Sequence, residues 1–162
     1  MPANTGYKSL QDLKGMTLVT PDPDSITAVM VRAMFKGDKL VATADRDPVP
    51  PKIRVITTIY QEAVPFYIEN GFAQAGATAA NAVVKAWTEK GGKVFAKSKS
   101  VPIKQFVVSA TLSPDEQQRI RDALLNSRDS KPGRDALETL GYKGFVAPNP
   151  EIEAATIAWL GL

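Results

Sequence analysis

The sequence contains neither cysteine nor histidine among its 162 residues. Without cysteine the chain has no disulfide, no thiolate metal site and no cysteine nucleophile. Without histidine it has no serine–histidine triad, no imidazole ligand for zinc and no imidazole acid–base catalyst. Any catalyst would have to use carboxylates, lysine or tyrosine, so we expect a protein that is not an enzyme and that holds no metal and no cofactor.

Long apolar segments and blocks of like charge are also missing. No stretch reaches the roughly 18 apolar residues of a membrane-spanning helix. The N-terminal MPANTGYKSLQDLKG lacks the basic start and apolar centre of a signal peptide, so an exported protein would have lost its signal from this sequence. The 20 basic and 17 acidic residues are interspersed, with a net charge of +3 and no run of five like charges. We therefore expect neither a membrane-spanning nor a nucleic-acid-binding protein.

What remains is an alternation of strand-like and helix-like segments. Strand patterns are present at residues 16–21, 53–59, 73–78, 93–98 and 104–111. Helical patterns are present at residues 25–35, 60–72, 79–90, 113–127, 132–141 and 150–162. This order predicts an α/β fold with a mainly parallel sheet and flanking helices. The pattern changes near Val101, which predicts an α/β lobe over residues 1–100 and a return strand with C-terminal helices over 101–162.

The sequence VTPDPDSITA marks one strand-to-helix junction, and in open parallel sheets ligands bind at such junctions. The first N–H groups of a helix lack intrahelical acceptors, and the helix dipole is positive there. The hydroxyls of Ser25 and Thr27 could add donors. The alternative is that Ser25 is simply the N-cap of the helix, a common role for serine. The candidate ligand-binding residues at this junction are Ser25, Ile26, Thr27 and Ala28.

Two further junctions carry polar side chains. Tyr60 and Gln61 follow the strand-like segment 53–59, and Thr78 follows 73–78. The alternatives are that Tyr60 is an ordinary amphipathic residue and that the small residues around Thr78 serve tight packing of a strand on a helix. Hydroxyl, amide and phenol groups at three junctions, with few charges, favour a site that holds a ligand without transforming it.

Five motifs occur in an order that resembles a known family. They are SLQDLKGMTLV, PDPDSITA, YQEAVPFYIENGFAQAGAT, VPIKQFVVSATLSPDEQQRIRDALLNS and PGRDALETLGYKGFVAPN. Their order is similar to that in the phosphate/phosphite/phosphonate-type periplasmic solute-binding proteins of ABC transporters, and the resemblance covers nearly the whole chain. Its most specific part is the last third, where IRDALL and GxxxLxxLGYKGF follow a strand.

The resemblance implies a type II periplasmic-binding-protein fold, a periplasmic location, a small oxyanion such as a phosphonate or phosphate as ligand, and an ABC permease as partner. In the family, a serine- and threonine-rich turn at a helix start grips the oxyanion, and the matching turn here is Ser25-Ile26-Thr27-Ala28. The chain departs from the family at Ala28, where the family has glycine, at Tyr60-Gln61, where it often has Ser-His, and at Ala79, where it often has an acid. These departures change the side chains that select the ligand.

Family members are close to twice as long as this chain, and SLQDLKG normally follows a complete first lobe. The chain therefore resembles a second lobe with its return segment. We expect a homo-oligomer, a swapped arrangement or a companion lobe to cover the apolar faces of helix 113–126 and the terminal helix. Two other hypotheses stay open: a degenerate single-lobe interaction or oligomerisation module, and the ligand-sensing effector domain of a regulator. The lack of a helix-turn-helix or basic segment argues against the effector domain of a regulator.

Overall fold

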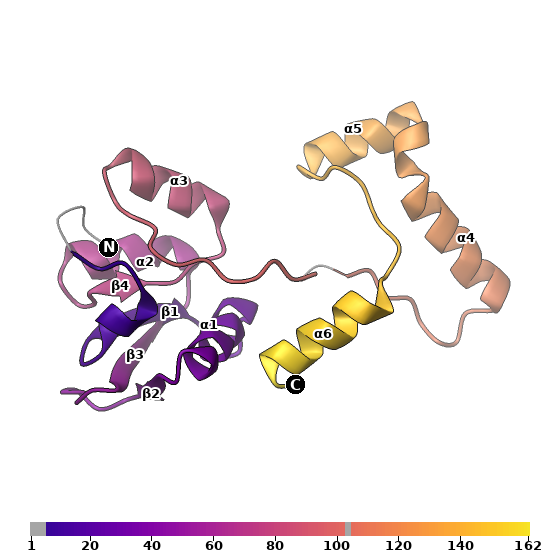
Figure 1. The fold of residues 1–162 in the computed structure, drawn as a ribbon. Helices are drawn as coiled ribbons and strands as arrows, with labels where there is room; N and C mark the ends of the chain where they lie inside the picture. Colours follow the sequence, from indigo (N-terminus) through magenta and orange to yellow (C-terminus); the bar gives the residue numbers. More distant parts are fainter. Residues whose placement is uncertain (1–5, 103–104) are drawn as a thin grey trace. The chain divides into compact units, whose positions relative to one another are not determined.

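The computed structural model describes residues 6–102 and 105–162, which fall into two compact units. The first unit consists of Met1–Val101 together with Ile157–Leu162, and the second of Pro102–Thr156. In the described residues the first unit holds all the strands, and the second is built from helices and their connections (Figure 1).

The sheet of the first unit is entirely parallel, which confirms the predicted fold class. Its strands are β1 (Thr17–Pro21), β2 (Val41–Thr43), β3 (Lys52–Thr58) and β4 (Ala75–Gly76), in the spatial order β2-β3-β1-β4. Val19 in β1 lies opposite Ile56 of β3 and Gly76 of β4. Every residue of β1 is buried, as expected for a central strand covered on both faces.

Strands β1, β3 and β4 each lead into a helical segment. The 3-10 turn η1 (Leu10–Leu13) precedes β1, and α1 (Ile26–Gly37) follows it. The turn η2 (Gln61–Ala63) and α2 (Val64–Glu69) follow β3, and α3 (Asn81–Glu89) follows β4. The pattern at 60–72 predicts one helix that Pro65 kinks near its start, and the structure divides this segment into η2 and α2, with Pro65 in the first turn of α2. Proline is tolerated there because the first N–H groups of a helix have no intrahelical acceptor.

Two apolar clusters form the core on opposite faces of the sheet. The buried members of the first cluster are Leu13, Leu18, Phe35, Leu40, Ile53 and Ala75. The buried members of the second are Val19, Val64, Ile68 and Ala73. Leu18 and Val19 are successive strand residues, so their side chains point to opposite faces. The first cluster therefore lies on the face that α1 covers, and the second on the face that α2 covers.

The second unit contains α4 (Pro114–Leu125), η3 (Ser127–Asp129), α5 (Lys131–Thr139) and most of α6 (Pro150–Leu160). A capping box begins α4: the Glu116 amide donates to Ser113 Oγ at 3.3 Å, and the Ser113 amide donates to Glu116 Oε2 at 2.8 Å. The ring of Phe106 meets that of Phe145 edge-on, at 5.0 Å between centroids.

The strands predicted at 93–98 and 104–111 do not form. Residues 93–98 have no regular secondary structure and belong to no sheet, and the same holds for Gln105–Ser109, while Lys104 lies outside the described residues. Both segments have the apolar, β-branched composition of strands. A strand also needs a neighbour with which to pair its backbone, and in the described residues neither segment has one.

Candidate functional site

The three predicted strand-to-helix junctions lie together at the carboxyl-terminal edge of the sheet, that is, at the ends of its strands. Residues 25–28 follow β1, residues 60–61 follow β3, and Thr78 follows β4. These three strands are parallel neighbours in the order β3-β1-β4, so their carboxyl ends lie side by side. The sequence prediction that these residues share one site depends on this arrangement, which is the usual position of a ligand in an open parallel sheet.

At the start of α1, one of the proposed donors is already engaged. Ser25 is the N-cap, and its Oγ accepts a hydrogen bond from the Ala28 amide at 3.2 Å. The Ser25 hydroxyl proton and the amides of Ile26 and Thr27 have no acceptor among the described residues. Thr27 and Ala28 are buried, whereas Ile26 is 36% exposed. The donors at the helix start without an acceptor among the described residues are therefore the first two amides and the hydroxyls of Ser25 and Thr27.

Gln61 joins two of the junctions. Its Oε1 accepts hydrogen bonds from Thr78 Oγ1 at 3.0 Å and from the Ala79 amide at 2.6 Å. The Thr78 hydroxyl also accepts the Ala80 amide at 3.1 Å, which satisfies one of the open N–H groups before α3. Since both of these bonds use the oxygen end of the Gln61 amide, its Nε2 group is left as a donor with no acceptor in the described part of the chain.

Tyr60 lies at the rim of this edge. Its side chain is 68% exposed, and its carbonyl accepts a long hydrogen bond of 3.5 Å from Thr58 Oγ1. Tyr60 is therefore open to solvent, whereas Gln61 and Thr78 are joined by a hydrogen bond.

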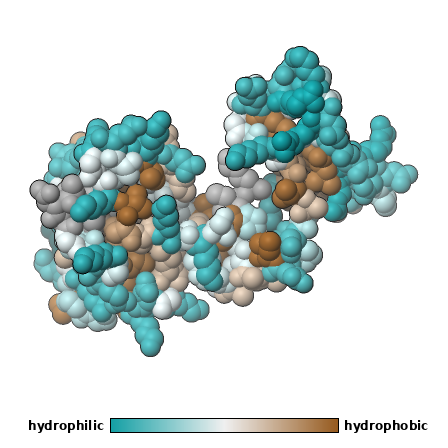
Figure 2. All heavy atoms as spheres, turned by 45° about the horizontal axis from the view of Figure 1, so that its top comes forward, coloured by the Kyte–Doolittle hydropathy of each residue, from teal (hydrophilic) through white to brown (hydrophobic). Residues whose placement is uncertain are grey.

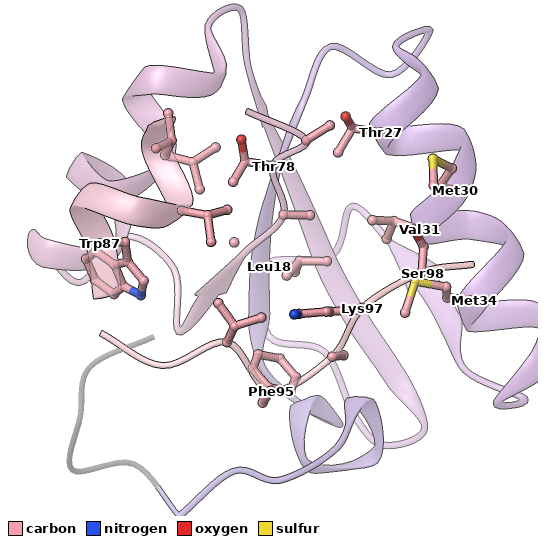
Figure 3. A pocket seen from close by; sticks show the side chains of 18 of the residues that line it. Leu18, Thr27, Met30, Val31, Met34, Thr78, Trp87, Phe95, Lys97 and Ser98 are labelled. Atoms are coloured by element: carbon pink, nitrogen blue, oxygen red, sulfur yellow. The ribbon is translucent and has the colours of Figure 1, made fainter. Parts of the chain in front are cut away.

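A cavity of about 440 Å³ lies in the first unit below this edge. Thr27 and Thr78 stand at its upper end in Figure 3, and Met30, Met34 and Trp87 form side walls. Most of its lining is apolar, and Figure 2 shows hydrophobic surface between hydrophilic rims on the same unit. Sequence analysis did not assign Met30, Met34 or the segment 93–98 to any cavity, because their proximity depends on tertiary packing.

Ionic groups contribute little to the edge itself. The Asp22 carboxylate accepts the Asp24 amide at 2.9 Å, and the Asp22 carbonyl accepts the Ser25 amide at 2.9 Å, so the two acids form a turn before the helix. Arg32 donates to the Pro23 carbonyl at 2.8 Å. Among the described residues, no group of three or more acidic side chains is placed to hold a metal ion, and no helix is long and apolar enough to cross a membrane.

The fold and the polar groups together define a class of protein: an α/β lobe with a parallel sheet and with polar groups at the carboxyl ends of its strands. The chain belongs to the family of periplasmic substrate-binding proteins of phosphonate ABC transporters, whose model matches residues 1–151. This match confirms the resemblance that the five motifs indicate. No curated protein sequence matches the chain.

Solved structures match the fold. XAC2383 from Xanthomonas citri bound to ATP matches with a TM-score of 0.77 at 15% identity, over 98% of this chain and 62% of that one. The same protein bound to chloride ion matches with a TM-score of 0.73 at 16% identity, over 98% of this chain and 61% of that one. The chain thus spans about three fifths of the length of these relatives.

Proposed function

We propose that the chain forms one lobe of the solute-binding component of an ABC uptake system, and that it binds a small phosphonate or phosphate-like oxyanion without converting it. Membership of the phosphonate family supports a periplasmic role beside an ABC permease. Because structural relatives are longer than the chain, the complete site would need a companion lobe to close over the ligand.

The observation that carries the proposal is a set of unused donors at one edge of the sheet. The amides of Ile26 and Thr27 come from the start of α1, and Gln61 Nε2 comes from the neighbouring junction. Helix N-termini bind anions because their N–H groups point outward and the helix dipole is positive there. Neutral donors of this kind can hold an oxyanion that must later be released, since no salt bridge has to be broken.

Gln61 offers the sharpest test, because Gln61→Glu preserves the oxygen that accepts the Thr78 and Ala79 bonds. It replaces the free Nε2 donor with a negatively charged oxygen. A hydrogen bond to a charged group contributes about 1.5–3 kcal/mol, so the affinity for an anion should fall by a factor of about ten to a hundred. Folding should be largely retained, because both backbone and hydroxyl contacts of the side chain can persist.

Gln74→Glu is a matched control. Gln74 Oε1 accepts the Thr17 amide at 2.9 Å, so it makes the same type of contact at the opposite end of β4. The two variants therefore differ in position and agree in charge. Gln74→Glu should leave the affinity for the anion unchanged.

The assay is amide NMR of the 17.5-kDa chain, titrated with methylphosphonate, phosphate, phosphite or sulfate to about 20 mM. This concentration is chosen because an isolated lobe should bind with a Kd in the millimolar range (about −4 kcal/mol). We expect saturable shifts at Ile26, Thr27 and the Gln61 side chain. If none of the four anions shifts these resonances, or if Gln61→Glu binds as well as Gln74→Glu, this edge is not an oxyanion site.

A further inference from the structure

The end of α2 carries an asparagine followed by a glycine, and both belong to a closed helix C-cap. Asn70 is the C-cap residue, with φ −92° and ψ 7°, and Gly71 follows with φ 73°. The Gly71 amide donates to the Ile68 carbonyl at 3.1 Å. The Phe72 amide donates to the Tyr67 carbonyl at 2.9 Å. These two bonds define a Schellman motif, in which glycine is preferred because it adopts a positive φ at little cost.

The side chain of Asn70 lies against the same helix end and is open to solvent. Its Nδ2 donates to the Phe66 carbonyl at 2.8 Å. Asn70, Gly71 and Phe72 are all exposed, and a Cβ atom at Gly71 would meet nothing within 4 Å. Water and hydroxide therefore reach the Asn70–Gly71 peptide bond, while hydrogen bonds at the end of α2 hold the side-chain amide and the Gly71 amide to separate carbonyls.

We propose that Asn70-Gly71 is a site of spontaneous deamidation, which reacts when the end of α2 opens. The Gly71 nitrogen loses its proton to hydroxide and attacks Cγ of Asn70. The new N–Cγ bond closes a five-membered succinimide ring, the Cγ–Nδ2 bond breaks, and the side-chain nitrogen leaves as ammonia with a proton from water, which regenerates hydroxide. Water then opens the ring at either carbonyl and leaves aspartate or isoaspartate. Glycine permits the attack because it has no Cβ beside the attacking nitrogen.

The closed cap slows this reaction without preventing it. In the closed cap the Gly71 amide is directed at the Ile68 carbonyl, and Asn70 Nδ2 is directed at the Phe66 carbonyl. Both bonds must open before the nitrogen can approach Cγ. Because α2 has only 6 residues and helix ends fray at little free-energy cost, this opening is frequent. Deamidation in the folded chain should therefore be slower than in an unfolded peptide of the same sequence by no more than about hundredfold.

The products disturb the end of α2 in two ways. Either product removes the side-chain donor to the Phe66 carbonyl and places a negative charge at the negative end of the helix dipole. Isoaspartate also adds a methylene group to the backbone before Phe72 and Ala73, whose amides both donate to the Tyr67 carbonyl. The rings of Tyr67 and Phe72 pack edge-on across this cap, 5.9 Å apart between centroids. Isoaspartate should therefore speed amide exchange at Phe72 and Ala73 by about tenfold or more.

The test is incubation of the full chain in mildly alkaline buffer, followed by peptide mapping with mass spectrometry, which detects the replacement of the side-chain amino group by a hydroxyl. A synthetic peptide of residues 66–76 gives the reference rate without a folded cap. Asn126 is a matched control in the same chain, because it is the C-cap of α4 with nearly the same backbone (φ −93°, ψ 11°) but precedes Ser127. Asn70→Gln keeps an amide that would have to close a six-membered ring, so this variant should not convert.

We expect Asn70 to convert at a rate that rises with hydroxide concentration. Asn126 should convert about tenfold or more slowly, because the Ser127 side chain hinders the attack. The proposal is overturned if Asn70 converts more than about hundredfold more slowly in the chain than in the peptide, or if Asn126 converts as fast as Asn70. Unchanged amide exchange at Phe72 in the isolated isoaspartate form would refute the predicted effect on the cap.

Discussion

Replacing Gly76 with alanine tests how closely β4 is packed against α2. A Cβ atom built at Gly76 would lie 3.0 Å from Val19 Cγ1 and 3.2 Å from Ile68 Cδ1, and closer still to Val64 Cγ1. Val19, Val64 and Ile68 are all buried members of the second cluster. Overpacking a closed core costs about 1–3 kcal/mol. The reduced entropy of the unfolded chain offsets about 0.4–1 kcal/mol of this, and the middle of the two ranges leaves a net loss of about 1–2 kcal/mol.

The assay is urea or thermal unfolding followed by tryptophan fluorescence, to which Trp87, packed against the second cluster, and Trp159 both contribute. A loss of 1–2 kcal/mol should lower Tm by roughly 4–15 °C for a domain of this size. Gly37→Ala is the control, because a Cβ at Gly37 meets nothing within 4 Å and the residue is the last of α1. Its only effect should be a small gain from reduced chain entropy.

A double variant separates steric overlap from other causes. Val64→Ala removes the methyl group that lies nearest to the added Cβ. If overlap is the reason, Gly76→Ala with Val64→Ala should be less destabilised than the sum of the single variants, by about 0.5–3 kcal/mol. The reasoning is refuted if Gly76→Ala is as stable as the parent, or if the two losses are additive.

Three further predictions concern the core of the first unit and the capping box of α4 in the second. Leu13→Ala should cost about 2–5 kcal/mol in tryptophan-monitored unfolding, because Leu13 is fully buried, whereas Ile59→Ala, at 79% exposed in the same unit, should cost far less. Ser113→Ala should cost α4 about 1 kcal/mol, measured by amide exchange. Hydrogen bonds from Ser113 lower the pKa of Glu116, so that carboxylate contributes stability above its unfolded pKa of about 4.3. This contribution disappears as pH falls through the lower folded pKa, and Glu116→Gln should therefore reduce the stability of α4 at pH 7 but not at pH 2.

Local sequence patterns were sufficient to predict most of the helices and strands. Serine before a helical pattern predicts the caps at Ser25 and Ser113, and both serines accept hydrogen bonds from the first turn of their helices. The capping box at Glu116 depends on residues three apart. Alternation of strands and helices predicts the parallel sheet, because parallel strands require crossover connections.

Contacts between residues far apart in the chain could not be predicted from the sequence. Gln61 and Thr78 are 17 residues apart, and nothing in either local pattern indicates that the Gln61 oxygen would bind the Thr78 hydroxyl. Residues 93–98 have the composition of a strand whether or not a neighbour exists, so the pattern predicts extended backbone but not a sheet. Ligand binding depends on a second molecule, which local patterns in the sequence do not describe. It therefore stays a prediction for Ser25, Ile26, Thr27, Ala28, Tyr60, Gln61 and Thr78.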